Sequence, residues 1–359
     1  MSATARTSFG AYVARRVAWM VPTLIGITLV VFLAMHAAPG DPSAVAGGDP
    51  SAASMGVDVA ARVERIRAEN LLDEPLWTQY LHFLGPFDLS PRGHEWFGGT
   101  GERRWHGLLA LDFGREIGRA DVDVAAEIGR RLWVSVPLSL AALLVTYVVA
   151  VPLGAWAATR AGTRRERVVS LLVFLLHAVP AFWLGLLLVL AFGATGLGWL
   201  PVIGLRGEHA DSMGTWARAV DLARHALLPV ATLSLASLAY VSRHVRAGVV
   251  SALREDYVRT ARAKGVPERD VLVRHALRGA LLPLITLLGS VLPALVAGSV
   301  VVETIFNLEG VGRYAYEGLL ARDVHVVLAV TVVSAVATMI GILLSDLAYG
   351  AADPRIRHG

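Results

Sequence analysis

The 359-residue chain has no cysteine, a single lysine and few charged residues. Without cysteine it cannot form disulfides, thiolate metal sites or a cysteine nucleophile. Charged residues make up 17% of the chain, whereas soluble domains average about a quarter. Hydrophobic residues make up 55% and the mean hydropathy is +0.56. Depleted charge together with long apolar runs predicts an all-α membrane protein that crosses the bilayer several times.

Recognisable nucleotide, metal and nucleic-acid sites are also missing. A phosphate-binding loop needs Gly-Lys followed by Ser or Thr, and the single lysine, Lys264, is followed by Gly265 and Val266. The eleven histidines show no metal-binding spacing, and His36 and His177, which lie in apolar runs, are expected to be structural. The positive charge is sorted into separate loops rather than one face. We therefore predict no bound cofactor, no metal and no nucleic-acid partner.

Six apolar runs predict six transmembrane helices. The first is too long for the apolar core of a signal peptide and is expected to remain as a span. Several runs contain proline, which neighbouring helices in a membrane can accommodate. The runs cover residues 17–38, 132–159, 168–197, 226–242, 281–305 and 324–349.

Basic residues near the ends of the runs predict the orientation. They gather in the N-terminal segment, after the second run, after the fourth run and in the tail, which places both termini in the cytoplasm. Arg130 and Arg131 are exceptions within a long translocated segment, where the rule is weak. The predicted order is a cytoplasmic start with the first span (1–38), an external region (39–131), a five-helix core (132–350) and a cytoplasmic tail (351–359).

The external region contains three amphipathic or aromatic stretches. Residues 58–72 have apolar side chains at helical spacing, residues 76–87 are rich in aromatics, and residues 121–132 form an amphipathic stretch that leads into the membrane. We expect these stretches to pack against other external segments.

The basic loop at 243–282 carries the strongest functional signal. Leu253, Tyr257, Thr260, Ala261 and Lys264 share one face of a predicted helix, which ends at the Gly-Val-Pro sequence beginning at residue 265. A second helix is predicted at 268–277. A basic helix lying on anionic lipid would explain the charge. It would not explain a break followed by a second helix, so we favour a projection that contacts a partner.

Two carboxylates lie in or at the end of predicted spans. Glu303 is a candidate for a gate or pathway lining, with a helix cap or salt bridge as the alternative. For Asp346 a structural pair with an arginine is favoured. A proton-coupled secondary transporter could use both carboxylates. A weaker alternative is an intramembrane hydrolase that uses Ser299 and His177.

Several stretches resemble the inner-membrane permeases of binding-protein-dependent ABC importers. Their cytoplasmic motif reads Glu-Ala-Ala followed by glycine, and here Arg259, Thr260 and Ala261 precede Gly265. The general motif also has a Leu-Pro pair downstream of the glycine, and here Leu282-Pro283 lies further from Gly265 than that motif allows. Both departures resemble the B-type subunit of the dipeptide, oligopeptide and nickel branch. The external stretch 85–110 looks longer than is usual. Other matching stretches are 12–42, 302–306, 310–313 and 353–357.

The resemblance implies a type I importer permease fold, called MetI-like, with a large external loop after the first helix. It implies that the chain is not itself an enzyme but a subunit that moves peptides across the cytoplasmic membrane. The expected partners are a second, C-type permease, two ATP-binding subunits and an external solute-binding protein. The loop that couples to the ATPases would contain Asp256, Tyr257, Arg259, Thr260, Ala261, Arg262, Ala263, Lys264 and Gly265.

Overall fold

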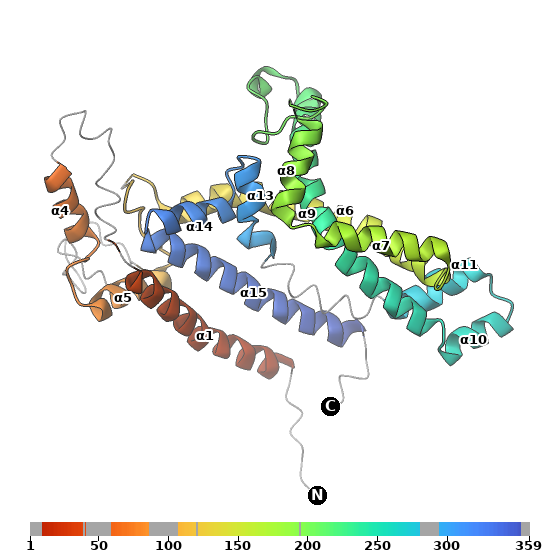
Figure 1. Ribbon diagram of the computed structural model, residues 1–359. Coiled ribbons are helices and arrows are strands. Elements are labelled where there is room, and N and C mark those ends of the chain that lie inside the picture. Colours follow the sequence, from red (N-terminus) through yellow and green to blue (C-terminus); the bar gives the residue numbers. More distant parts are fainter. Residues whose placement is uncertain are drawn as a thin grey trace, which may run out of the picture. The chain divides into compact units, whose positions relative to one another are not determined.

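The computed structural model (Figure 1) describes residues 9–38, 40, 59–85, 107–119, 121–193, 195–280 and 294–352. Within these ranges every regular element is helical, apart from an isolated antiparallel bridge between Arg115 and Asp123. This confirms the all-α class for the described part of the chain. The chain divides into two compact units, which are considered separately: Met1–Trp133 with Tyr314–Met339, and Val134–Arg313 with Ile340–Gly359.

The first unit is built around α1 and the beginning of α15, which lie side by side (Figure 1). Phe32, Tyr80, Leu328 and Val332 form its buried core. The Tyr80 hydroxyl donates to the carbonyl oxygen of Ile25 at 2.9 Å. The predicted helix at 58–72 corresponds to α4, and the aromatic stretch at 76–87 contains α5. The elements that contribute to this unit are α1 (Phe9–Ala37), α4 (Val59–Glu69), α5 (Leu76–Leu84), η1 (Leu108–Ala110), α14 (Val311–Leu320) and α15 (Val324–Ala352).

The second unit is organised by the crossing of α6 and α9. Ala150, Gly154 and Ala158 repeat every four residues on α6, so they share one helical face. A Cβ atom on Gly154 would lie 2.5 Å from the Ser242 carbonyl oxygen, so only glycine permits this approach. The elements are α6 (Val124–Thr159), α7 (Arg164–Ala178), α8 (Ala181–Phe192), η2 (Ala210–Ser212), α9 (Thr215–Ala252), α10 (Asp256–Ala263), α11 (Glu268–Asp270), the π-helical turn η3 (Val271–Ala276) and α13 (Val300–Ile305).

The expected single span at 168–197 is two helices, α7 and α8, which meet at an angle of 99°. The helix is broken there because Pro180 lacks a backbone N–H and disfavours helical geometry in the residue before it. Val179 is accordingly extended, with φ −76° and ψ 123°. In contrast, Pro22, Pro137, Pro152 and Pro229 lie inside helices, as the sequence analysis assumed for a membrane protein.

The fourth apolar run, at 226–242, is much shorter than the helix that contains it. α9 extends over 38 residues, from Thr215 to Ala252. Hydropathy marks the part of a helix that lies in lipid, whereas arginine is a good helix former and does not end the helix. Residues 243–252, which the sequence analysis placed in the basic loop, are therefore the helical end of α9. Similarly, α6 begins at Val124 and contains most of the amphipathic stretch at 121–132 together with the second run, so the expected boundary at 131/132 falls within one helix.

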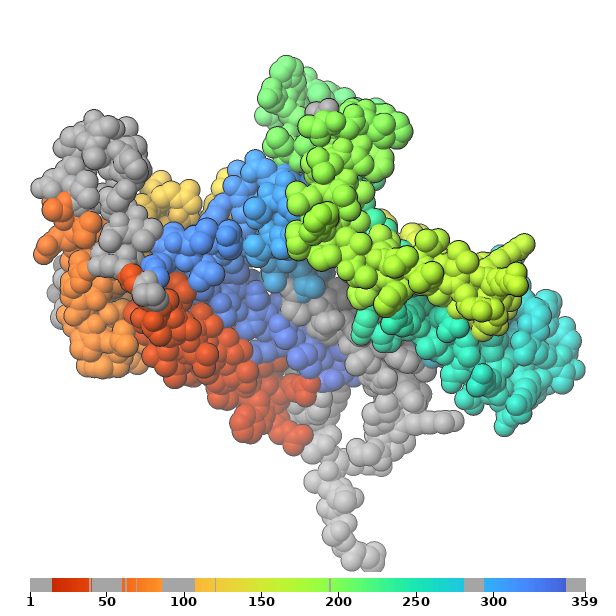
Figure 2. All heavy atoms as spheres, in the orientation of Figure 1, coloured from red at the N-terminus to blue at the C-terminus, as the bar shows by residue number. Residues whose placement is uncertain are grey.

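Four of the described helices are long and apolar enough to cross a membrane, and the bent α7–α8 pair makes up to five. The run at 281–305 lies partly outside the described residues, and its described end contains α13. The stretches 86–106 and 353–359 are also outside. Figure 2 shows α7 and α8 at the molecular surface. They expose apolar side chains suited to lipid or to a protein partner: Val168, Leu171, Leu172, Leu175, Trp183 and Leu190.

Candidate functional site

The first candidate is a projection at the end of α9, formed by α10, a turn, α11 and η3 (Figure 1). Val258 is fully buried and packs with Ala261 of α10 against Val271 of η3. Leu253 and Val266 cover the edges of this small cluster. The cluster holds the two sides of the projection together, and Leu253 also packs against the core between α6 and α9, so the two cores adjoin there.

The turn after α10 has the hydrogen bonds of a Schellman motif. The Val266 N–H donates to the Ala261 carbonyl at 3.2 Å, and the Gly265 N–H donates to the Arg262 carbonyl at 2.9 Å. Gly265 has a φ of +79°. Arg262 then pairs with Glu268 across the turn through two bonds of 2.8 and 3.1 Å. Its hydrogen bond holds the pKa of Glu268 below the usual range.

The outer face of α10 differs in part from the predicted face. Leu253 caps α9 rather than belonging to α10, and Ala261 faces inward with Val258. Tyr257, Thr260 and Lys264 remain on one exposed face, together with other exposed candidates of the predicted coupling loop: Asp256, Arg259, Arg262, Ala263 and Gly265. The sequence pattern failed at Ala261 because alanine suits both a buried and an exposed position.

We predict that Gly265→Val weakens the projection, whereas Gly265→Asn is tolerated better. No atom lies within 4 Å of a Cβ built on Gly265, so the strain comes from the positive φ alone. Left-handed backbone costs an L-residue about 1–2 kcal/mol, and asparagine adopts it more readily than valine. Hydrogen–deuterium exchange at α10 should rise in the valine variant and change less in the asparagine variant. Equal exchange in both variants would contradict this account.

The second candidate is Glu303, which is fully buried in the first turn of α13. Its Oε1 accepts a hydrogen bond from the Ser135 hydroxyl at 2.8 Å and one from the Ser299 N–H at 3.2 Å. Its Oε2 accepts the Arg313 N–H at 2.7 Å. Ser135 in turn accepts the Val311 N–H at 2.9 Å. One carboxylate thus joins α13, α6 and the start of α14.

Glycines make room for this carboxylate. A Cβ atom on Gly310 would overlap the carboxyl carbon of Glu303, and one on Gly298 would overlap its Oε1. Gly298 also has a φ of +65°. Backbone N–H groups that converge on a negative charge in a site without room for side chains are typical of a structural anion nest. Sequence reasoning identified Glu303 but not the serine and the glycines around it.

A separate buried polar cluster lies in the first unit, and the sequence analysis missed it. The Tyr314 hydroxyl donates to Glu116 at 2.8 Å, and Arg131 stacks 4.4 Å from the Tyr314 ring centre. Asp323 accepts the Ile117 N–H at 2.6 Å. Burial raises the pKa of Asp323, which precedes the α15 span, to about 6. Because its members are far apart in sequence, no local motif marks this cluster.

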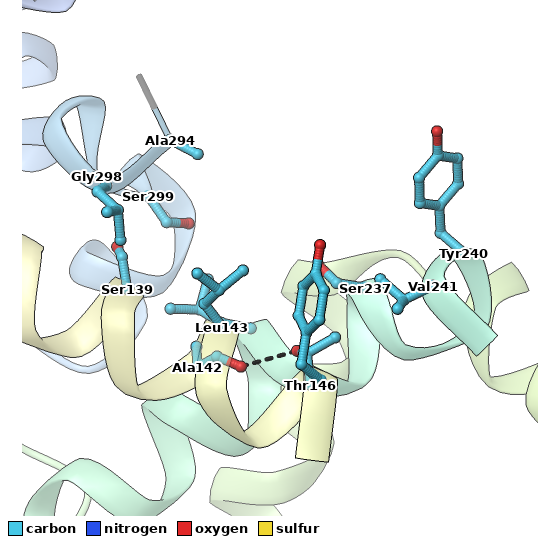
Figure 3. Close-up of a pocket in the computed structure, with 13 residues that line it drawn as sticks. Ser139, Ala142, Leu143, Thr146, Ser237, Tyr240, Val241, Ala294, Gly298 and Ser299 are labelled. Atoms are coloured by element: carbon cyan, nitrogen blue, oxygen red, sulfur yellow. Dashed lines mark hydrogen bonds between the residues drawn. The ribbon is translucent and has the colours of Figure 1, made fainter. Parts of the chain in front are cut away.

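A pocket of about 330 Å³ lies between α6, α9 and the residues that precede α13 (Figure 3). Figure 3 shows the hydroxyls of Ser139, Ser237 and Ser299 around it. Thr146 also lines it and donates its hydroxyl to the Ala142 carbonyl at 2.8 Å. The lining residues in the described ranges include no charged side chain. This surface can form weak, uncharged hydrogen bonds.

The remaining candidates are two histidines, a serine and an aspartate. The imidazole of His177 hydrogen-bonds to the Ala236 carbonyl at 3.2 Å, and that of His36 to Gln79 at 3.0 Å. Ser299 caps α13 by accepting the Val302 N–H. Asp346 is half-buried in α15. Across the described residues, no group of three His, Cys, Asp or Glu side chains is placed to hold a metal ion.

Comparison with known proteins gives a consistent family. The model of the family described as "Binding-protein-dependent transport system inner membrane component" matches residues 150–358. The oligopeptide transport system permease protein AppB of Bacillus subtilis is 34% identical over 348 residues, covering 97% of this chain and 99% of AppB. The dipeptide transport system permease protein DppB of Escherichia coli is 31% identical, covering 97% and 98%. The di/tripeptide permease protein DppB of Pseudomonas aeruginosa is 32% identical at the same coverage.

Proposed function

Because the chain belongs to the family of binding-protein-dependent transport system inner membrane components, we propose that it is the permease subunit of an ABC importer for peptides. The observation that carries the proposal is the similarity over 97% of the chain to permeases of oligopeptide and dipeptide transport systems. The similarity extends over the projection, both helical units and the external region. It therefore supports the same overall role rather than a shared fragment.

We propose a topology of six spans with both termini in the cytoplasm. The arginine distribution supports this orientation. In this topology α1, α6, the α7–α8 pair, α9 and α15 are five of the spans, and the apolar run predicted at 281–305, whose described end contains α13, is the remaining one. The region between α1 and α6 then lies outside the cytoplasmic membrane.

The projection at α10 is proposed as the surface that contacts an ATP-binding subunit. Its exposed face offers Tyr257, Thr260 and Lys264, and its own small core makes it a compact body at the end of α9. ATP binding in the partner would bias the permease between two states, and the projection would transmit that bias through α9. The complex would also include two ATP-binding subunits, a second permease of C type and an external solute-binding protein.

The uncharged pocket between α6 and α9 is proposed as part of the translocation pathway. Passage requires binding that is weak enough for release. Hydroxyls from Ser139 and Ser237 can bind peptide amide groups without the strong attraction that a fixed charge would exert on a peptide terminus. The pathway would thus accept peptides of different sequence.

The two alternatives lack such support. A proton-coupled transporter that used Glu303 would need this carboxylate to reach water, but Glu303 is fully buried and hydrogen-bonded. An intramembrane hydrolase needs an activated serine, but Ser299 caps α13 and His177 bonds to a backbone carbonyl.

Uptake of a labelled dipeptide and of a labelled oligopeptide by cells that lack this chain tests the proposal. Re-expression of the chain should restore uptake of at least one of the two, and collapse of the proton gradient at constant ATP should leave this uptake intact. Uptake that vanishes with the proton gradient would favour the secondary transporter instead.

A further inference from the structure

A second pocket, of about 250 Å³, lies between α6, α7 and α9. Arg243, Arg246 and Glu166 line it together with apolar side chains that include Val173 and Phe174. It shares no lining residue with the uncharged pocket, and the proposed import mechanism does not use it. Two cations and one anion give its lining a net positive charge.

The charged side chains of the pocket differ in their partners within the fold. Glu166 is buried and pairs with Arg246, with 3.0 Å between Oε1 and Nε. Glu166 also accepts the Ser170 hydroxyl at 2.9 Å. Arg243 is exposed, and its contact within the described ranges is with the Phe174 ring, 5.7 Å from the ring centre. The Arg243 guanidinium can therefore donate hydrogen bonds to an anion that enters the pocket.

The pocket lies where three helices change from apolar to basic sequence. Arg160 follows α6, Arg164 opens α7 just before its apolar stretch, and Arg243 follows the apolar run of α9. Such a change marks the level of the lipid headgroups. Beside the pocket, α7 exposes Leu171, Leu172 and Leu175 on its apolar surface. A ligand can thus meet a cation and an apolar helix at the same place.

We propose that this pocket binds an anionic phospholipid. The phosphate accepts hydrogen bonds from Arg243, and an acyl chain lies along the apolar surface of α7. Basic pockets between membrane helices are recognised sites for anionic headgroups, and guanidinium matches phosphate geometry. The assignment of this lipid to the cytoplasmic leaflet rests on the topology proposed above. The existence of the site rests on the charges, the cavity and the position of the apolar runs.

Titration of the purified full-length chain with phosphatidylglycerol in detergent tests the site, with the midpoint of thermal unfolding as the readout. A ligand that binds the native state raises this midpoint. We expect stabilisation by phosphatidylglycerol and little by phosphatidylcholine. Arg243→Gln should raise the half-saturating phosphatidylglycerol concentration at least about tenfold, as expected for the loss of one charge-assisted contact to phosphate.

Two further variants keep the test specific. Arg269→Gln removes the same charge from an exposed position outside the pocket and should leave the titration unchanged. Val173→Trp fills the cavity without changing charge and should weaken binding as Arg243→Gln does. If both the Arg269 and the Arg243 variants needed equally more phosphatidylglycerol for half-saturation, the lipid would be held by general surface charge, and the proposed site would be wrong. An unchanged titration in the Arg243 variant would also overturn it.

Soluble glycerol 3-phosphate distinguishes a lipid from a free phosphate. The lipid proposal predicts that it stabilises the chain far less than phosphatidylglycerol does, because it has no acyl chain. Equal stabilisation would make the ligand a soluble anion and overturn the proposal. The titration requires no transport and no ATP, so its failure would leave the import function standing.

Discussion

Glu303→Ala is expected to prevent accumulation of the folded chain rather than only to slow transport. The substitution removes the acceptor for Ser135, Ser299 and Arg313 in a fully buried site. Each buried donor left unsatisfied costs about 1–3 kcal/mol, and proteins are stable by only about 5–15 kcal/mol. The monodisperse peak in fluorescence-detected size exclusion should fall to about a tenth of wild type or less.

Glu309→Ala is the matched control, because Glu309 lies in the same segment but is exposed. Its peak should stay close to that of wild type, because an interaction at an exposed position contributes little to stability. Glu303→Gln should be intermediate, since the amide retains one of the two acceptor oxygens. A Glu303→Ala chain that purifies normally and fails only in transport would instead support a gate at this residue.

Val258→Asp has the second largest expected effect. It should unfold the projection while leaving the membrane helices folded. The side chain at this position is fully buried against Ala261 and Val271. An aspartate there buries an uncompensated charge, whose desolvation costs several kcal/mol, more than such a small cluster can offset. The projection should unfold locally, and substrate-stimulated ATP hydrolysis by the complex should be lost.

The readouts for this variant are hydrogen exchange of α10 and the yield of the assembled chain. Exchange should reach the rate of an unfolded segment while the yield stays near wild type. Ala263→Asp places the same charge on the exposed side of α10 and should preserve the protection of α10 from exchange. Normal protection in Val258→Asp would show that the small cluster does not hold the projection.

The sequence predicted the features that depend on local composition. Long apolar runs identified the long helices α1, α6 and α15, and the glycine at 265 correctly marked the end of α10. The helix at 268–277 was also predicted, although its middle is the π-helical turn η3. These features follow from hydropathy and from the backbone freedom of glycine, both of which can be identified residue by residue.

Features that depend on contacts between distant residues were not predictable. The bend at Pro180 was taken as a proline that a helix tolerates, because the sequence alone does not show which prolines have neighbours that preserve the helix. Glu303 depends on Ser135, which is 168 residues away. The Tyr314–Glu116 bond spans 198 residues. A single sequence, considered without an alignment to its relatives, gives no sign of such pairs.

The most direct test of the central claim is affinity purification of the tagged chain from its native membrane in mild detergent, followed by mass spectrometry. The permease proposal predicts a second permease and one or two proteins that carry the phosphate-binding loop, and Val258→Asp should reduce recovery of the latter. A chain that purifies alone and, after reconstitution, moves its substrate with only a proton gradient would contradict the proposal.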